Sequence, residues 1–126
     1  MGLGFLKIAV VYLVLGACLG LAMGIRQQFG LTPVHAHLLL LGWASLALAG
    51  IVYHLYPGAA LTRLARAHFW LHNLGLPAFM GGLALMLTGY AWAEPVTVVG
   101  AIGVLVGLVL FAINVFVHAK PAAVAS

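Results

Sequence analysis

The chain of 126 residues is almost entirely apolar: 66% of its residues are hydrophobic, 5% are charged, and its mean hydropathy is +1.24. The net charge of +4 comes from five Lys and Arg residues against a single acidic residue, Glu94. The basic residues stand at the ends of apolar stretches, where they act as topology signals and not as a nucleic-acid-binding surface. This composition excludes a soluble domain and predicts an integral membrane protein surrounded by lipid.

Four apolar stretches are each long enough to cross a bilayer, which takes about 20 residues as a helix. We predict these helices at about residues 4–25, 33–56, 61–90 and 95–118. The second begins after Thr32-Pro33, and Pro77 is expected to kink the third. Because only short loops separate the stretches, residues 1–126 are predicted to form a single all-α domain, a four-helix transmembrane bundle.

The basic residues also predict an orientation. One end of the bundle carries Lys7, Arg63, Arg66 and Lys120, whereas the other end carries Arg26 and Glu94. The positive-inside rule therefore places both termini of this multi-pass protein in the cytoplasm.

Small residues at helical spacing indicate where helices pack closely. GxxxG units occur on the first and fourth helices, at Gly16, Gly20 and Gly24 and at Gly103 and Gly107. Such units mediate contacts either within one chain or between copies. Since so short a chain has little interior of its own, we expect a homo-oligomer.

Histidines within membrane spans are costly and usually functional. His35 and His37 lie near the outer end of the second helix, and residues two apart point about 200° apart. They cannot chelate one metal from a single turn, so they either serve two different centres or simply reach interfacial water. His118, beside Lys120, is predicted to be an interfacial residue.

A second set comprises His54 on the second helix with His68 and His72 on the third. His68 and His72 are four residues apart and share a helical face. This set could bind copper or zinc, or it could be a hydrogen-bonded group that joins the two helices. The spacing favours the structural interpretation.

The sequence also limits the chemistry. Its single acid, Glu94, lies in a loop, and neither a Gly-rich phosphate loop nor a Ser/His/Asp set is present. Hydrolytic and covalent catalysis are therefore not expected. Redox or gas-binding chemistry at a histidine-held cofactor remains, as does a cofactor-free structural or channel-like oligomer.

Two segments resemble subunit I of the heme–copper oxidases and nitric oxide reductases. The first contains Thr32-Pro33-Val34-His35-Ala36-His37, Trp43, Gly50 and Tyr53-His54-Leu55-Tyr56-Pro57, and is similar to the second transmembrane helix of that family. The second, Arg66-Ala67-His68-Phe69-Trp70-Leu71, is similar to the third. The whole chain looks like short bacterial proteins described as cytochrome oxidase subunit I-like, which implies a bacterial inner-membrane location.

The resemblance implies a heme b site at the outer end of the second helix. His35 matches the family's low-spin heme ligand, and His35-Ala36-His37 resembles a His-x-His motif in which each histidine serves a different heme. Gly42, on the same face as His35, would leave space for the flat macrocycle, and Arg26 would pair with the heme propionates. A copper or zinc ion at the histidines is the alternative, with His54, His68 and His72 the weaker candidates as ligands.

The departures from the family are equally informative. The family has twelve helices in three arcs of four, whereas this chain has four helices and lacks the copper-site histidines and proton-channel acids, so a single chain contains no complete oxidase active site. A four-helix chain resembling one arc implies a homotrimer that reproduces the three arcs. The expected function is electron transfer, with a redox partner, or the binding of nitric oxide or oxygen.

Overall fold

The computed structural model describes residues 1–123, and four helices in that range are long and apolar enough to cross a membrane. The elements in chain order are α1 (Gly2–Arg26), α2 (Thr32–His37), η1 (Leu38–Ala44), α3 (Ser45–Leu55), α4 (Pro57–Ala60), α5 (Arg63–Leu87), η2 (Ala91–Ala93) and α6 (Glu94–His118). The segments α2, η1 and α3 together form the second of the four long helices. The predicted all-helical architecture with four candidate membrane spans is confirmed.

The third long helix is shorter at both ends than the sequence predicts. It begins at Arg63, after Thr62, whose side-chain oxygen accepts a hydrogen bond from the Ala65 amide at 3.1 Å and so caps the helix. It ends at Leu87, two residues before Gly89, whose φ of 105° belongs to a region that favours glycine. Pro77 lies inside the helix without ending it.

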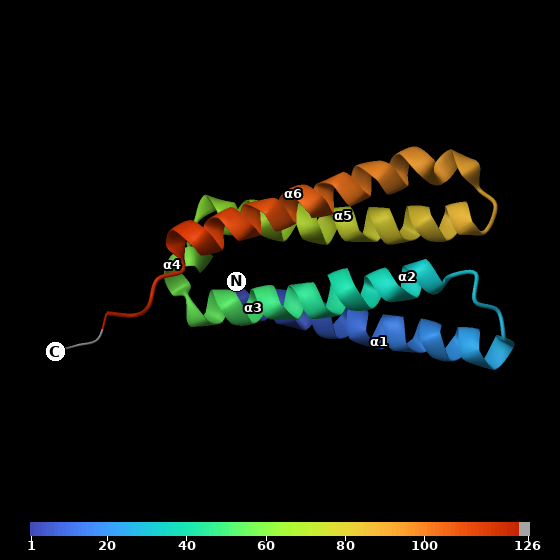
Figure 1. Ribbon diagram of the computed structural model, residues 1–126, viewed down its shortest axis with the longest axis horizontal. Helices are drawn as coiled ribbons and strands as arrows, with labels where there is room; N and C mark the ends of the chain where they lie inside the picture. The colour runs from blue at the N-terminus through green and yellow to red at the C-terminus, as the bar shows by residue number, and fades with distance from the viewer. Residues whose placement is uncertain (124–126) are drawn as a thin grey trace.

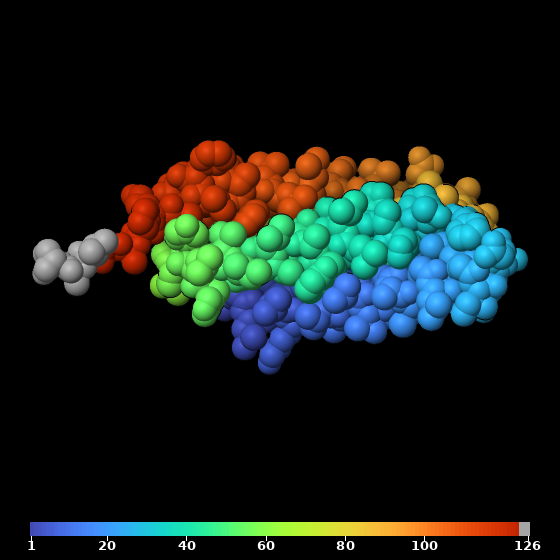
Figure 2. Space-filling model, turned by 60° about the horizontal axis from the view of Figure 1, so that its bottom comes forward, coloured from blue at the N-terminus to red at the C-terminus, as the bar shows by residue number. Residues whose placement is uncertain are grey.

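The four long helices form two antiparallel hairpins that lie against each other (Figure 1). One hairpin is α1 with α2–α3, and the other is α5 with α6. Both termini and α4 lie at one end, here called the terminal end, and the connections at residues 27–31 and 88–93 lie at the opposite end. Figure 2 shows α1 and the α2–α3 segment running side by side along the long axis.

Glycines allow the helices of each hairpin to approach closely. A methyl group at Gly75 would lie 2.9 Å from the Gly100 carbonyl oxygen, so α5 and α6 meet backbone to backbone there. A methyl group at Gly107 would lie 3.4 Å from the His72 amide nitrogen. The glycine row on α6 therefore serves contacts within the chain.

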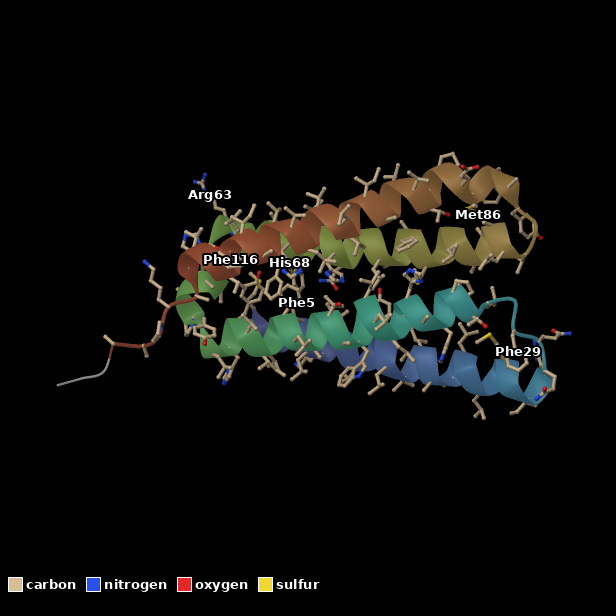
Figure 3. All side chains as sticks on the ribbon, in the orientation of Figure 1. Phe5, Phe29, Arg63, His68, Met86 and Phe116 are labelled. Atoms are coloured by element: carbon tan, nitrogen blue, oxygen red, sulfur yellow. The ribbon has the colours of Figure 1, made fainter. Side chains whose placement is uncertain are left out.

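The interior lies between the two hairpins and contains two apolar clusters. The cluster nearer the terminal end is built around Phe5, Leu46 and Tyr53, and the other contains Val34, Leu38, Leu76, Met80 and Val104. Figure 3 shows Phe5 and His68 in the layer between the hairpins. The outside is also apolar: Val99 is 70% exposed and Phe116 is 91% exposed. An apolar exterior of this kind fits a lipid environment.

Candidate functional site

His35 faces α1 and is held by it. Its Nδ1 lies 2.8 Å from the carbonyl oxygen of Gly16, which belongs to α1, the other helix of the same hairpin. The ring lies directly over Gly20, where a methyl group would be 2.6 Å from the His35 Cε1. Gly16 and Gly20 thus serve a contact inside the chain, with His35 filling the space that the glycines leave. At Gly24 the space is open, since a methyl group there would meet nothing within 4 Å among the described residues.

His37 points the other way, towards α5. Its ring packs edge-on against Phe79, with ring centroids 5.2 Å apart and planes at 68°. Its Nδ1 lies 2.6 Å from the carbonyl oxygen of Pro33, one turn earlier. The two outer histidines therefore diverge from their helix, as their two-residue spacing predicts.

The two outer histidines share a tautomer because each Nδ1 faces a carbonyl oxygen. A carbonyl oxygen can only accept, so Nδ1 carries the proton in His35 and in His37. The Nε2 of each neutral ring then has a free lone pair, and no hydrogen-bond partner for it occurs within residues 1–123. Metal-bound histidines commonly have this arrangement, with the second nitrogen donating to a backbone carbonyl.

The surroundings of these rings do not enclose a large ligand. The nearest cleft at this end, of about 250 Å³, is lined in part by Arg26, Met23 and Leu31. Gly42 is covered by Tyr12, since a methyl group at Gly42 would lie 2.5 Å from Cγ of that ring. The expected space for a macrocycle at Gly42 is therefore filled by Tyr12 within the chain. Arg26 is exposed at the end of α1.

His54 is separated from the other inner histidines. It is exposed near the end of α3 and lines a shallow cleft with Gly2 and Gly50 on the outside of the first hairpin. The expected grouping of His54 with His68 and His72 does not occur, because the preceding residue, Tyr53, takes the inward-facing position. No group of three or more His, Cys, Asp or Glu side chains in the described part of the chain is placed to hold a metal ion.

Tyr53, His68 and His72 form a continuous hydrogen-bonded chain between the hairpins. The Tyr53 hydroxyl lies 3.0 Å from Nδ1 of His68, and Nε2 of His68 lies 3.3 Å from Nδ1 of His72. Nε2 of His72 lies 2.8 Å from the carbonyl oxygen of Leu41. All three side chains are 2% exposed or less. The prediction of a hydrogen-bonded group joining the second and third long helices is confirmed for His68 and His72, with Tyr53 in place of His54.

The Leu41 carbonyl is available because it lies in η1, a π-helical segment. In an α-helix the Ser45 amide would donate to Leu41, but here it donates to Leu40, five residues back. The Ser45 hydroxyl donates to the same Leu40 oxygen at 2.7 Å. Leu41 is thereby left with a carbonyl that the His72 ring can reach from α5.

This geometry fixes the direction of every hydrogen bond when both rings are neutral. The Leu41 oxygen only accepts, so Nε2 of His72 carries a proton and Nδ1 of that ring must accept. Nε2 of His68 therefore donates to His72, and Nδ1 of His68 accepts from the Tyr53 hydroxyl. All four ring nitrogens are engaged, which leaves no lone pair on either ring for a metal ion.

A second polar pair continues from the chain towards the terminal end. The buried Asn114 amide donates to the Ala59 carbonyl at 3.0 Å. Nδ1 of the half-buried His118 donates to Oδ1 of Asn114 at 3.0 Å. His118 thus lies at the end of the bundle, as predicted, and is linked to the interior. The Asn73 side chain, in contrast, donates to Phe69 of its own helix.

Sequence reasoning misses Tyr53, Asn114 and the Leu41 carbonyl. Tyr53 differs from His54 by one position, which is 100° of helix rotation, and only the tertiary packing decides which side chain faces inwards. An amide side chain in the middle of the last turns of the mostly apolar 95–118 stretch is a usable signal for Asn114. No family model matches the chain, and no curated protein or solved structure matches it.

The position of His35 depends on the absence of a side chain at Gly20. We expect Gly20→Ala to push the ring away from α1, to break its hydrogen bond to Gly16, and to cost roughly 1–3 kcal/mol through overpacking. Gly24→Ala is the matched control because it meets open space. Thermal unfolding and the ¹⁵N NMR signals of the His35 ring test this. Equal effects of the two substitutions would contradict the packing described.

Proposed function

We propose that this protein binds heme b through His35 and His37 and acts in electron transfer or in the binding of nitric oxide or oxygen. The observation that carries the proposal is the state of the two rings. Each donates Nδ1–H to a backbone carbonyl and has an unengaged Nε2, the arrangement typical of imidazoles that ligate iron. The resemblance of residues 32–57 and 66–71 to the heme-bearing subunit of respiratory oxidases adds to it.

The second axial ligand is proposed to come from another copy of the chain. His35 faces α1 and His37 faces α5, so they do not face one iron. The ring nitrogens of His68 and His72 are all engaged. The outer cleft of about 250 Å³ is smaller than the 300–1,000 Å³ typical of pockets for drug-sized ligands. A macrocycle would therefore lie between copies, in keeping with a homotrimer.

Each residue then has a defined task. The backbone carbonyls of Gly16 and Pro33 orient the two imidazoles, and Phe79 supports the ring of His37. Arg26, exposed at the same end, is placed to pair with propionate groups at the membrane surface. When bound, the heme supplies one-electron transfer and a site for diatomic gases.

Mixing variants tests both the cofactor and its sharing. We expect purified protein reconstituted with heme to show Soret and α/β bands, which His35→Ala and His37→Ala each lose. Oligomers assembled from both variants together should regain part of the low-spin spectrum, because some interfaces keep one intact ligand from each chain. His54→Ala is the control, since His54 lies exposed in another part of the bundle.

Two results would count against the proposal. Full low-spin spectra in each pure variant would exclude ligation shared by His35 and His37. Wild-type protein that takes up no heme would exclude heme binding altogether, and a colourless protein that retains copper would favour the alternative metal.

The proposed location is the bacterial inner membrane, with the terminal end in the cytoplasm. That end of the bundle carries four of the five basic residues, Lys7, Arg63, Arg66 and Lys120. The positive-inside rule assigns the more basic end to the cytoplasm. In a Cys18→Ala background, Glu94→Cys should react with an impermeant thiol reagent added to intact spheroplasts. Labelling only after permeabilisation would show the opposite orientation.

A further inference from the structure

We propose that the groove between α1 and α5 at the terminal end binds one phospholipid with an anionic headgroup, whose phosphate is held by Arg66. This role is independent of heme and of the interior histidines. The groove has a volume of about 320 Å³ and is lined by Met1, Gly4, Arg66, Phe69 and Trp70. One cationic side chain therefore stands beside an otherwise apolar groove, which suits a molecule with a charged head and apolar chains.

The aromatic wall of the groove is held in place from the interior. The fully buried Phe5 ring meets Phe69 edge to face, with centroids 5.1 Å apart, and Phe69 meets Trp70 in the same way at 5.4 Å. Across the groove, a methyl group at Gly4 would find only the Phe69 ring within 4 Å among the described residues. The rings of Phe69 and Trp70 thus form a fixed surface, uncovered by α1, on which an acyl chain can lie.

The order of residues along α5 matches the order of the parts of a phospholipid. Arg66 lies in the first turn of the helix, and Trp70 follows four residues later on the same face, about 6 Å further along the axis. Arginine side chains near helix ends extend to the headgroup level, and tryptophan is enriched at the membrane boundary. A phosphate at Arg66 therefore places the upper part of its acyl chain against Trp70, which is 59% exposed.

The charges around the groove favour an anionic headgroup. Arg63 precedes Arg66 by three residues on α5, and Lys7 follows Gly4 by three residues on α1. The only acidic side chain of the sequence, Glu94, begins α6 at the opposite end of the bundle. No acidic side chain therefore competes with a phosphate for Arg66, whose guanidinium can bind two phosphate oxygens at once. The ammonium group of a zwitterionic lipid, in contrast, would meet only like charges.

A bound lipid and a general attraction to a basic surface make different predictions for two arginines. Arg63 carries the same charge as Arg66 and is exposed on the same helix, but it does not line the groove and points away from the bundle (Figure 3). If anionic lipids respond only to the total charge of this end, Arg63→Gln and Arg66→Gln have equal effects. If a lipid occupies the groove, Arg66→Gln has the larger effect.

The experiment measures the quenching of Trp70 fluorescence by lipids with brominated acyl chains, which quench a tryptophan that they contact. Heme-free protein with Trp43→Phe and Trp92→Phe is reconstituted into phosphatidylcholine vesicles that contain a fixed fraction of either brominated phosphatidylglycerol or brominated phosphatidylcholine. We expect phosphatidylglycerol to be preferred at Trp70 by about fivefold, the factor that one basic side chain contributes near anionic lipid. Protein with Trp92 as its sole tryptophan, at the opposite end of the bundle, is the control and should show no preference.

Three further variants locate the bound lipid. Arg66→Gln should abolish the preference at Trp70, whereas Arg63→Gln should keep most of it. Gly4→Leu extends a side chain over Phe69 into the groove and should lower the preference while both arginines remain. The proposal would be overturned by protein that shows no preference with both arginines intact, by equal losses in the two arginine variants, or by an unchanged preference in Gly4→Leu.

Discussion

The hydrogen bond from the His72 ring to the Leu41 carbonyl is the interaction on which the interior arrangement depends. In the apolar interior of the bundle, leaving an imidazole or a carbonyl without a hydrogen bond costs about one to several kcal/mol of stability. Both groups must therefore find partners inside the protein. The π-helical segment η1 presents the carbonyl, and α5 presents the ring. Once His72 is fixed, His68 and Tyr53 follow in the only donor order that satisfies every nitrogen.

The same constraint explains how two hairpins become one bundle. Each hairpin is held together by close contacts at glycines, such as Gly75 with Gly100 in the α5–α6 pair. Between the hairpins the contacts are aromatic and polar, with Phe5 of α1 lying against His68 of α5 and Tyr53 of α3 lying against Phe111 of α6. The glycines thus set the spacing of helices within a hairpin, while the buried polar chain determines how the two hairpins are aligned.

Much of this fold follows from the sequence, because long apolar stretches and the distribution of charge are sufficient to locate four helices. The spacing of His68 and His72 is also enough to place them on one face. The choice between Tyr53 and His54 depends on a rotation of 100° about the helix axis, and a one-residue widening in η1 changes that rotation. No local sequence pattern in Leu38–Ala44 predicts this π-helical widening. The Leu41 carbonyl as the acceptor for His72, and Tyr53 as the hydrogen-bond partner of His68, are therefore identified only by the tertiary structure. The directions of the outer histidines, His35 and His37, are easier to predict, because a spacing of two residues by itself places two side chains on different faces of a helix.

The histidines therefore fall into two chemical classes that differ in which nitrogen carries the proton. His35 and His37 donate from Nδ1 and keep Nε2 free, as an iron ligand requires, whereas His68 and His72 donate from Nε2 and accept on Nδ1. Solid-state NMR of ¹⁵N-histidine-labelled protein in lipid distinguishes these tautomers by the chemical shifts of the two ring nitrogens. The account predicts Nδ1–H signals for His35 and His37 and Nε2–H signals for His68 and His72 in the heme-free protein. A single tautomer shared by all four rings, or an Nδ1–H signal from His68 or His72, would contradict it.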